Sequence, residues 1–194
     1  MKAAPAGQGA FKAVTVEVFL CRDGSSVEIR NDLRPGDMGA VVRQHGVLYS
    51  RECGFDHTIE IYVARPLSDF AENPGERQRL WIVERDGEFA GSAAIVEHSP
   101  EEAQFRWLLL DPSVRGRGIG RHLVSKALAF ARQARYRSVF LWTVHILPAA
   151  AHIYRSAGFT VTEENAVVQW GMNLREQRYE MRFERGGTAP GKGP

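Results

Sequence analysis

The sequence predicts a single mixed α/β domain arranged around a central β-sheet, and three observations support this prediction. Apolar residues such as Ile59, Val63 and Leu67 recur at the spacing of one helix face. Strand-like segments flank Asp86-Gly87, a dipeptide that strongly indicates a β-hairpin. An apolar run, a glycine-rich turn and a helical pattern follow one another between residues 105 and 134.

The first half of the chain contains two predicted helices between two pairs of predicted strands. Alternating apolar residues predict the first two strands, and the turn signal Arg22-Asp23-Gly24-Ser25 lets them pair as a hairpin. Pro35-Gly36-Asp37 marks a helix start, because proline suits the first helical turn. The expected order is strands 14–20 and 27–30, helices 35–49 and 56–70, and strands 80–84 and 88–96.

The second half predicts strands that alternate with helices. A helix that starts near Pro148 ends at Gly158, since glycine readily adopts the conformation that closes a helix. The segment around Trp170-Gly171 can extend either of the last two strands. The expected elements are strand 102–110, helix 119–134, strand 138–144, helix 148–157, and strands 159–164 and 178–183.

Composition narrows the class of protein. A chain of 194 residues with a net charge of +2 predicts one core and gives no reason to expect nucleic-acid or lipid partners. No signal-peptide pattern occurs, and the longest apolar run, 139–153, is too short to span a bilayer, so a cytoplasmic location is expected. No histidine or cysteine pair has zinc spacing, so no metal is expected.

The segment Arg115-Gly116-Arg117-Gly118-Ile119-Gly120-Arg121 carries the strongest functional signal. Glycines let the backbone approach an anion, and the first N–H groups of a helix lack partners within it. Arginines add forked donors that suit phosphate oxygens. The pattern predicts a phosphate-binding loop, although a solvated basic turn is an alternative interpretation.

Two other phosphate-binding motifs do not fit this loop. No G-x-x-x-x-G-K-[ST] string occurs, which excludes a P-loop. A dinucleotide fingerprint needs its third glycine one place later than Gly120, and a carboxylate that residues 138–141 do not supply. The remaining pattern is R-x-x-G-x-G at Arg115, Gly118 and Gly120.

Together with the segment Leu108-Leu109-Leu110-Asp111-Pro112 before it, this loop resembles the acyl-coenzyme A loop of the GNAT superfamily of N-acetyltransferases. Tyr154-x-x-x-Gly158-Phe159 resembles the end of that superfamily's second motif. Residues 33–37 and 45–49 are similar to a bacterial subgroup whose members also occur fused behind winged-helix regulators. The resemblance covers about residues 27–183.

The resemblance implies an acyl-CoA N-acyltransferase fold: a mainly antiparallel central sheet flanked by helices, with two strands splayed to hold the cofactor. We therefore expect an N-terminal extension, partly disordered, at 1–26, the acetyltransferase domain at 27–184 and a flexible tail at 185–194. The residues expected to bind acetyl-CoA are Leu108, Leu109, Leu110, Arg115, Gly116, Arg117, Gly118, Ile119, Gly120 and Arg121.

Acetyl transfer needs a general acid for the leaving thiolate and a base for the amine. Tyr154 occupies the family's tyrosine position and is the candidate acid, and the alternative is a core tyrosine packed on Phe159. Glu60 is the first candidate base because its neighbours predict a half-buried helix face, and Glu102 is the second. Glu52 is a further possibility, and each carboxylate can instead be solvated.

The cofactor strand also carries Arg106, which can either orient an acidic acceptor or form a structural ion pair. The expected activity is direct transfer of an acetyl group from acetyl-CoA to a primary amine in a ternary complex. The acceptor can be a small molecule or a protein amine. A non-catalytic acyl-CoA-binding sensor or interaction module is the alternative, and exposed edge strands make a homodimer possible.

Overall fold

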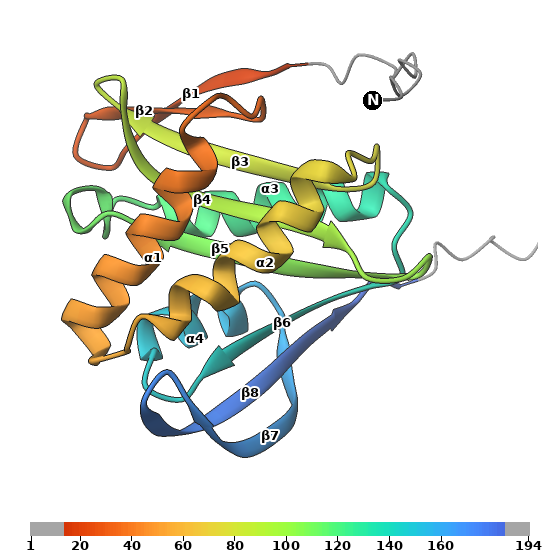
Figure 1. Cartoon of the computed structure of the whole chain (residues 1–194). Helices are drawn as coiled ribbons and strands as arrows, with labels where there is room; N and C mark the ends of the chain where they lie inside the picture. Colours follow the sequence, from red (N-terminus) through yellow and green to blue (C-terminus); the bar gives the residue numbers. More distant parts are fainter. Residues whose placement is uncertain (1–13, 185–194) are drawn as a thin grey trace, which may run out of the picture.

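The computed structural model describes residues 14–184, which form one eight-stranded sheet with helices on both faces (Figure 1). The strand order is β1-β2-β3-β4-β5-β6-β8-β7, and every neighbouring pair is antiparallel except β5 and β6. The mainly antiparallel sheet predicted from the sequence is therefore confirmed. The flexible tail expected at 185–194 and residues 1–13 of the expected N-terminal extension lie outside the described residues. Residues 14–26 of that extension are described.

Most element boundaries agree with the sequence pattern. Strands β5 (Glu102–Leu110) and β6 (Ser138–Val144) match their predicted ranges. The other elements are β1 (Val16–Leu20), β2 (Ser26–Arg30), α1 (Asp37–Cys53), α2 (Thr58–Glu72), β3 (Arg79–Arg85), β4 (Glu88–Glu97), a 3₁₀ turn (Pro112–Val114), α3 (Ile119–Gln133), α4 (Pro148–Ser156), β7 (Thr160–Gln169) and β8 (Met172–Arg182).

The first strand joins the sheet rather than preceding it. β1 pairs with β2 along its whole length, from Val16 opposite Arg30 to Leu20 opposite Ser26. The boundary predicted between residues 26 and 27 therefore does not mark the edge of the fold. Val16 and Val18 face solvent on this edge strand.

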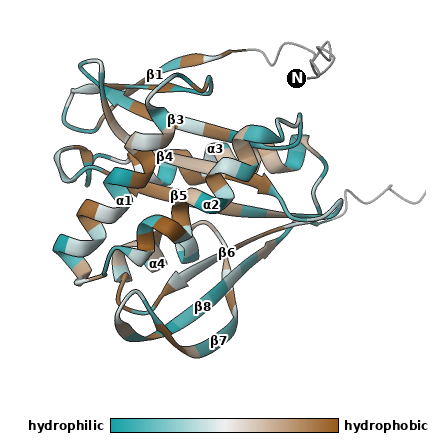
Figure 2. Cartoon of the chain, viewed as in Figure 1, coloured by the Kyte–Doolittle hydropathy of each residue, from teal (hydrophilic) through white to brown (hydrophobic). Residues whose placement is uncertain are grey.

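The last two strands are longer than predicted. Trp170 and Gly171 both have positive φ, +51° and +75°, which is the geometry of a tight two-residue hairpin turn. Gln169 and Met172 pair directly across that turn, so the segment extends both strands. Figure 2 shows hydrophilic stretches along this hairpin, whereas the central strands are more apolar.

Two apolar clusters hold the helices to the sheet. On one face, Val41 of α1 and Leu67 of α2 pack against β3, β4 and β5. On the other face, α3 and α4 cover the remaining side chains of the same strands. Along β4, Ala94 joins the first cluster while Ala93 and Ile95 join the second, as the period-two alternation of a strand requires.

The parallel strands β5 and β6 separate halfway along their length. They pair only from Glu102 to Gln104, opposite Ser138 to Phe140. Beyond this point β5 also carries a bulge against β4, where Trp107 adopts a positive φ of +53°. Non-glycine residues rarely adopt this conformation, and such strain concentrates at functional sites. The splayed strands predicted from the sequence are present, and they open a gap that leads to the candidate site.

Candidate active site

A groove of about 560 Å³ runs from the N-terminus of α3 to the point where β5 and β6 separate. Its lining includes most of the residues predicted to bind acetyl-CoA. These are Leu108, Leu109, Leu110, Arg115, Gly116, Gly118, Gly120 and Arg121. Side chains of α1 and α4 complete the opposite wall, among them Glu52 and His152.

Local geometry makes the start of α3 suited to an anion. Gly118 precedes the helix with a φ of +97°, and no side chain caps the free N–H groups of the first turn. Gly120 lies so close to Ile153 that an added Cβ would come within 3.1 Å of its Cδ1 atom. The unpaired backbone donors and the positive end of the helix dipole therefore face an open groove.

The arginines of the loop have different neighbours. Arg115 donates to the Leu110 carbonyl at 2.8 Å and to Glu52 at 2.9 Å. Arg121 lies 3.0 Å from His152 Nε2. Arg117 turns away from the groove to pair with Asp23 at 2.6 Å. The side chain of Ile119 is buried in the core, so only the backbone of these last two residues remains available to a ligand.

The groove has one basic residue that the sequence had not indicated. Arg22, in the turn between β1 and β2, lines it beside Gly118. The Arg22 backbone N–H donates to the Arg117 carbonyl at 3.4 Å, which holds the hairpin against the loop. The sequence indicated only a turn at Arg22. Its contact with a loop some 95 residues later depends on strand pairing, which the local pattern does not reveal.

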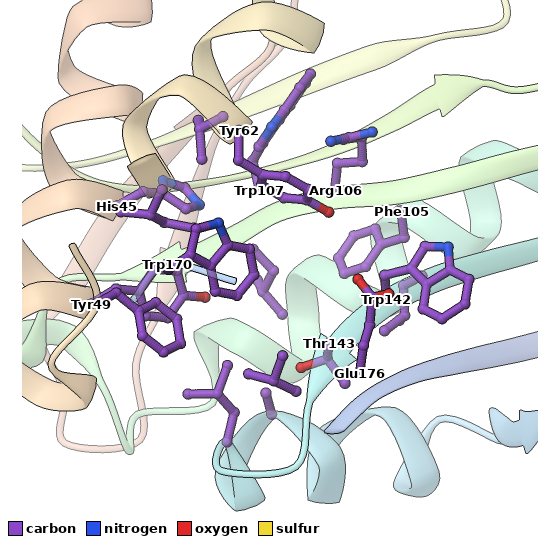
Figure 3. A pocket seen from close by; sticks show the side chains of 18 of the residues that line it. His45, Tyr49, Tyr62, Phe105, Arg106, Trp107, Trp142, Thr143, Trp170 and Glu176 are labelled. Atoms are coloured by element: carbon purple, nitrogen blue, oxygen red, sulfur yellow. The ribbon is translucent and has the colours of Figure 1, made fainter. Parts of the chain in front are cut away.

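An inner cavity of about 100 Å³ adjoins the groove between α1, α2, β5, β6 and β8 (Figure 3). The two share Tyr49, Leu108, Leu147 and Ala150, so they form one continuous site. Half of the remaining lining residues are aromatic, with His45 counted among them. Its polar and aromatic side chains include His45, Tyr62, Gln104, Phe105, Arg106, Trp107, Trp142, Thr143, Tyr154, Trp170 and Glu176.

Tyr154 lies at the base of this cavity and is 6% exposed. Its ring packs edge-on against Phe105 and Phe159, with centroid separations of 6.3 and 6.1 Å. The core packing weighed in the sequence analysis is therefore present, and the side chain also lines the cavity, while its role as the acid stays a prediction. Burial raises the pKa of the Tyr154 phenol, so it is protonated at neutral pH.

The predicted bases do not line the cavity. Glu60 is exposed and lies over Gly46 of α1, so its surroundings are not the half-buried face that had been expected. Glu102 sits at the start of β5, where Arg178 pairs with it at 2.7 Å. At about 3.3 Å per residue, Glu102 is roughly 20 Å along the strand from Leu108. Glu52 lines the groove rather than the cavity.

The acidic residue that does line the cavity is Glu176 of β8. Burial raises the pKa of its carboxyl group, and the negative charge of Glu163 on β7 raises it further. No sequence pattern pointed to this residue, because it lies in the segment whose strand assignment was open. Its position follows from its pairing opposite Val144 of β6.

His45 also reaches the cavity, from α1. Its Nδ1 lies 2.8 Å from the carbonyl oxygen of Val41, one helical turn earlier. Burial lowers the pKa of His45 to about 4, so the ring is neutral at physiological pH. Nδ1 then carries the proton that Val41 accepts.

The described residues 14–184 contain neither a metal-binding cluster of side chains nor a membrane-spanning helix. No group of three His, Cys, Asp or Glu side chains there could hold a metal ion. None of the helices in this range combines the length and hydropathy needed to cross a bilayer. The cytoplasmic location and the homodimer expected from the sequence remain predictions.

Comparison with known proteins agrees with this geometry. The family model described as "Acetyltransferase (GNAT) family" matches residues 47–159. An N-acetylaspartate synthetase of Xenopus tropicalis is 28% identical over 146 residues, which are 71% of this chain and 53% of that protein. The N-acetyltransferase YjgM of Escherichia coli is 25% identical over 122 residues, or 61% of this chain and 72% of the relative.

Solved structures share the fold at low sequence identity. The structure of yncA from Salmonella typhimurium with acetyl-CoA has a TM-score of 0.67 at 17% identity, covering 86% of this chain and 99% of the other. A ribosomal-protein-alanine N-acetyltransferase of Brucella melitensis gives a TM-score of 0.63 at 18% identity, covering 80% of this chain and 99% of the other. The finer resemblance to the winged-helix-associated subgroup remains a prediction. The family model spans more than half of the chain and covers both the loop and the Tyr154 motif, and the chain therefore belongs to the acetyltransferase (GNAT) family.

Proposed function

We propose that the protein transfers an acetyl group from acetyl-CoA to a primary amine by direct attack in a ternary complex. One observation carries the proposal. A groove with unpaired backbone donors and arginines adjoins a cavity whose lining includes a buried tyrosine and a partly buried carboxylate. This arrangement supplies an anion site, an acid and a base along one continuous path.

The groove supports acetyl-CoA binding in two ways. Its polar end, at the start of α3, offers backbone N–H groups and the side chains of Arg22, Arg115 and Arg121 to phosphate oxygens. Its apolar walls, which include Ile146 and Pro148, suit the less polar pantetheine arm. Bound acetyl-CoA would supply the thioester, whose carbonyl carbon the amine attacks.

The β5 strand is suited to orient that thioester. Past Gln104 its edge no longer pairs with β6, so backbone groups there remain available to a ligand. Ser92 Oγ donates to the Trp107 carbonyl at 2.8 Å and fixes the bulge. Fixed donors near a developing oxyanion are among the strongest contributions to acyl transfer. We propose that backbone N–H groups of 107–110 fill this role.

The acceptor's ammonium group must lose a proton before its nitrogen can attack, because an alkylammonium has no lone pair. Glu176 is the best-placed base, since it lines the cavity and its raised pKa brings it nearer to neutral pH. Transfer can proceed directly or through one water. A role as the general base remains a prediction for Glu60 and Glu102. Their positions outside the cavity lining favour Glu176 over either of them.

Tyr154 is proposed to protonate the leaving thiolate. Its phenol is protonated at neutral pH, and it lines the cavity that adjoins the groove. Burial also raises the proton affinity of a thiolate in the same apolar site, so the transfer does not depend on an acidic phenol. The bond that breaks is the carbon–sulfur bond, and the proton ends on sulfur.

Relatives leave the acceptor open. One relative is named an N-acetylaspartate synthetase, and another, from Escherichia coli, is a spermidine N(1)-acetyltransferase that is 29% identical over 119 residues. One name thus points to an acidic acceptor and the other to a polycation. The chain spans only 53% of the first relative and 60% of the second, so neither activity transfers to it.

Calorimetry and thiol release together test the proposal. Acetyl-CoA is expected to bind with measurable heat, and Arg115→Gln combined with Arg121→Gln should weaken it at least about tenfold, as a lost pair of charged contacts predicts. Incubation with a broad set of primary amines should release free thiol with at least one of them. Binding without thiol release would support the sensor alternative. An absence of binding by the folded protein would refute both.

A further inference from the structure

Arg106 is a half-buried cation without an acidic partner. Its Nη1 donates to Gln104 Oε1 at 2.9 Å, and its guanidinium lies over the rings of Tyr62 and Trp107 at 5.7 and 5.4 Å. Within residues 14–184 no carboxylate forms an ion pair with it. Loss of water around the group lowers its pKa, a cost that buried arginines normally offset with an acid.

The position of Arg106 links the inner cavity to the surface. It lines the cavity and also an outer hollow of about 510 Å³. Tyr62 and Trp170 belong to both linings, so the two spaces adjoin. The outer hollow is formed by Thr58, Ile61, Tyr62, Arg65, Pro66, Arg106, Val168, Gln169 and Trp170. These residues include two arginines and no acid, so a molecule that enters here first meets positive charge.

The charge reverses deeper in the site. Glu176 is the acidic residue of the cavity lining, and Tyr62 feels both the positive charge of Arg106 and the negative charge of Glu176. Figure 3 shows the Tyr62 hydroxyl and the Glu176 carboxylate directed toward the same central space, with Arg106 beyond them. Positive outside and negative inside is the arrangement that a zwitterion complements.

We propose that the acceptor is an amino carboxylate, such as an α-amino acid, whose carboxylate pairs with Arg106 while its amine faces Glu176. This inference depends on the proposed acetyl transfer and names its substrate class. Arginine binds a carboxylate in a two-pronged geometry that would fix the amine's direction. The rings of Tyr62 and Trp170 would cover the acceptor's side chain. A polyamine would meet the two arginines first and be repelled.

Matched acceptors test the inference. Phenylalanine, phenylalaninamide and phenethylamine share one skeleton, as do leucine, leucinamide and isoamylamine, and spermidine represents the polycations. Each rate is corrected for the neutral fraction of its amine, because the amides have more acidic ammonium groups. In at least one series kcat/KM is expected to be at least about tenfold higher for the acid than for the amide, as one charged hydrogen-bonding pair predicts.

Variants locate the source of that preference. Arg106→Gln should reduce the acid-to-amide ratio to near one, and Arg106→Lys should retain part of the ratio. Arg43→Gln, at an exposed position on α1 outside both spaces, is the matched control. Melting temperatures verify that each variant is folded.

Several outcomes would overturn the inference. A wild-type preference for amides or spermidine would do so, as would an acid-to-amide ratio that Arg106→Gln leaves intact. If acetyl-CoA binds and other amines are acetylated but no amino carboxylate is, this inference fails while the proposed function stands. If acetyl-CoA does not bind to the folded protein, the proposed function fails first.

Discussion

Arg115 and Glu52 lie across the groove from each other, with 2.9 Å between Arg115 Nη1 and Glu52 Oε2. The arginine comes from the loop before α3 and the glutamate from the end of α1. Both side chains are partly exposed, so the pair itself adds little stability. A phosphate that binds Arg115 must therefore displace Glu52 or share the arginine with it, and the carboxylate also repels the incoming charge.

Removing that competing charge should strengthen acetyl-CoA binding. Glu52→Gln is expected to lower the calorimetric Kd by up to about fivefold at low salt, which is the range of an exposed ion pair. The gain should shrink as salt screens the charges. Glu72→Gln, at an exposed position on α2 outside the groove, should leave the Kd unchanged. Weaker binding by Glu52→Gln would mean that the glutamate organises the loop for its ligand.

Tyr154 should affect turnover rather than cofactor affinity. Tyr154→Phe removes the proton donor but keeps the ring that packs on Phe105 and Phe159. Its kcat is expected to fall about 10²-fold, within the range of general acid catalysis, while the acetyl-CoA Kd stays the same. Tyr136→Phe is a useful control, because it also removes a buried hydroxyl, one that donates to the Arg77 carbonyl at 2.9 Å. An unchanged kcat for Tyr154→Phe would assign the residue to packing alone.

Glu176 should determine the acidic limb of the pH–rate profile. The carboxyl group must be ionised to act as a base, so kcat/KM should fall as pH drops through its raised pKa. Glu176→Gln should lower kcat/KM about 10²-fold near pH 7 and remove that limb. Glu163→Gln should move the limb to lower pH without abolishing activity, because Glu163 raises the pKa of Glu176. A limb that Glu163→Gln leaves in place would mean that another group titrates there.

Features that are contiguous in sequence were predicted most accurately. The hairpin turn at Asp86-Gly87 and the strand Glu102–Leu110 matched because local chemistry determines them. The loop at 115–121 stood out by its glycine spacing, and its interpretation as an acyl-CoA loop depended on the family resemblance of the surrounding segments. By contrast, a tryptophan at positive φ is uncommon, so Trp170-Gly171 gave no clear turn signal and the length of the last hairpin remained open.

Catalytic candidates were harder to predict, because a side chain's surroundings come from distant strands and helices. Ile59 is buried and Tyr62 lines the cavity, as the apolar stripe of the helix indicated. Glu60, one residue after Ile59, points in another direction around the helix and lies against Gly46 of α1. The periodicity thus identified a helix that lines the cavity, whereas Glu60 itself lies outside the cavity lining and its role as a base stays a prediction. Glu176 entered the site only through the pairing of β8 with β6, which a single sequence does not specify.

Arg22 offers a test of the β1–β2 hairpin as part of the cofactor site. The side chain lines the groove beside Gly118, where it adds a positive charge near the start of α3. Arg22→Gln is expected to raise the Kd for acetyl-CoA about threefold to tenfold and to reduce the salt dependence of binding. Arg43→Gln serves again as the control. A Kd equal to that of the wild type would leave Arg22 as a neighbour of the groove without a binding role.

His45 should make the fold sensitive to mild acid. Burial holds its pKa at about 4 in the native protein, whereas the unfolded chain has the ordinary value of 6.5. Below pH 6.5 the unfolded state therefore binds a proton that the native state does not bind. The free energy of unfolding falls as pH drops toward 4. The slope is about 1.4 kcal/mol per pH unit, which gives a loss of about 2 kcal/mol between pH 6.5 and pH 5.

Urea unfolding of His45→Asn measures this contribution. Asparagine keeps a donor for the Val41 carbonyl but cannot gain a proton, so the variant should lose less stability than the wild type as pH falls. The stability gap between the two proteins should shift by about 2 kcal/mol in favour of the variant between pH 7 and pH 5. His57→Asn, at an exposed position before α2, controls for the substitution itself. Parallel pH profiles for wild type and His45→Asn would mean that the buried ring accepts a proton without cost, which its surroundings argue against.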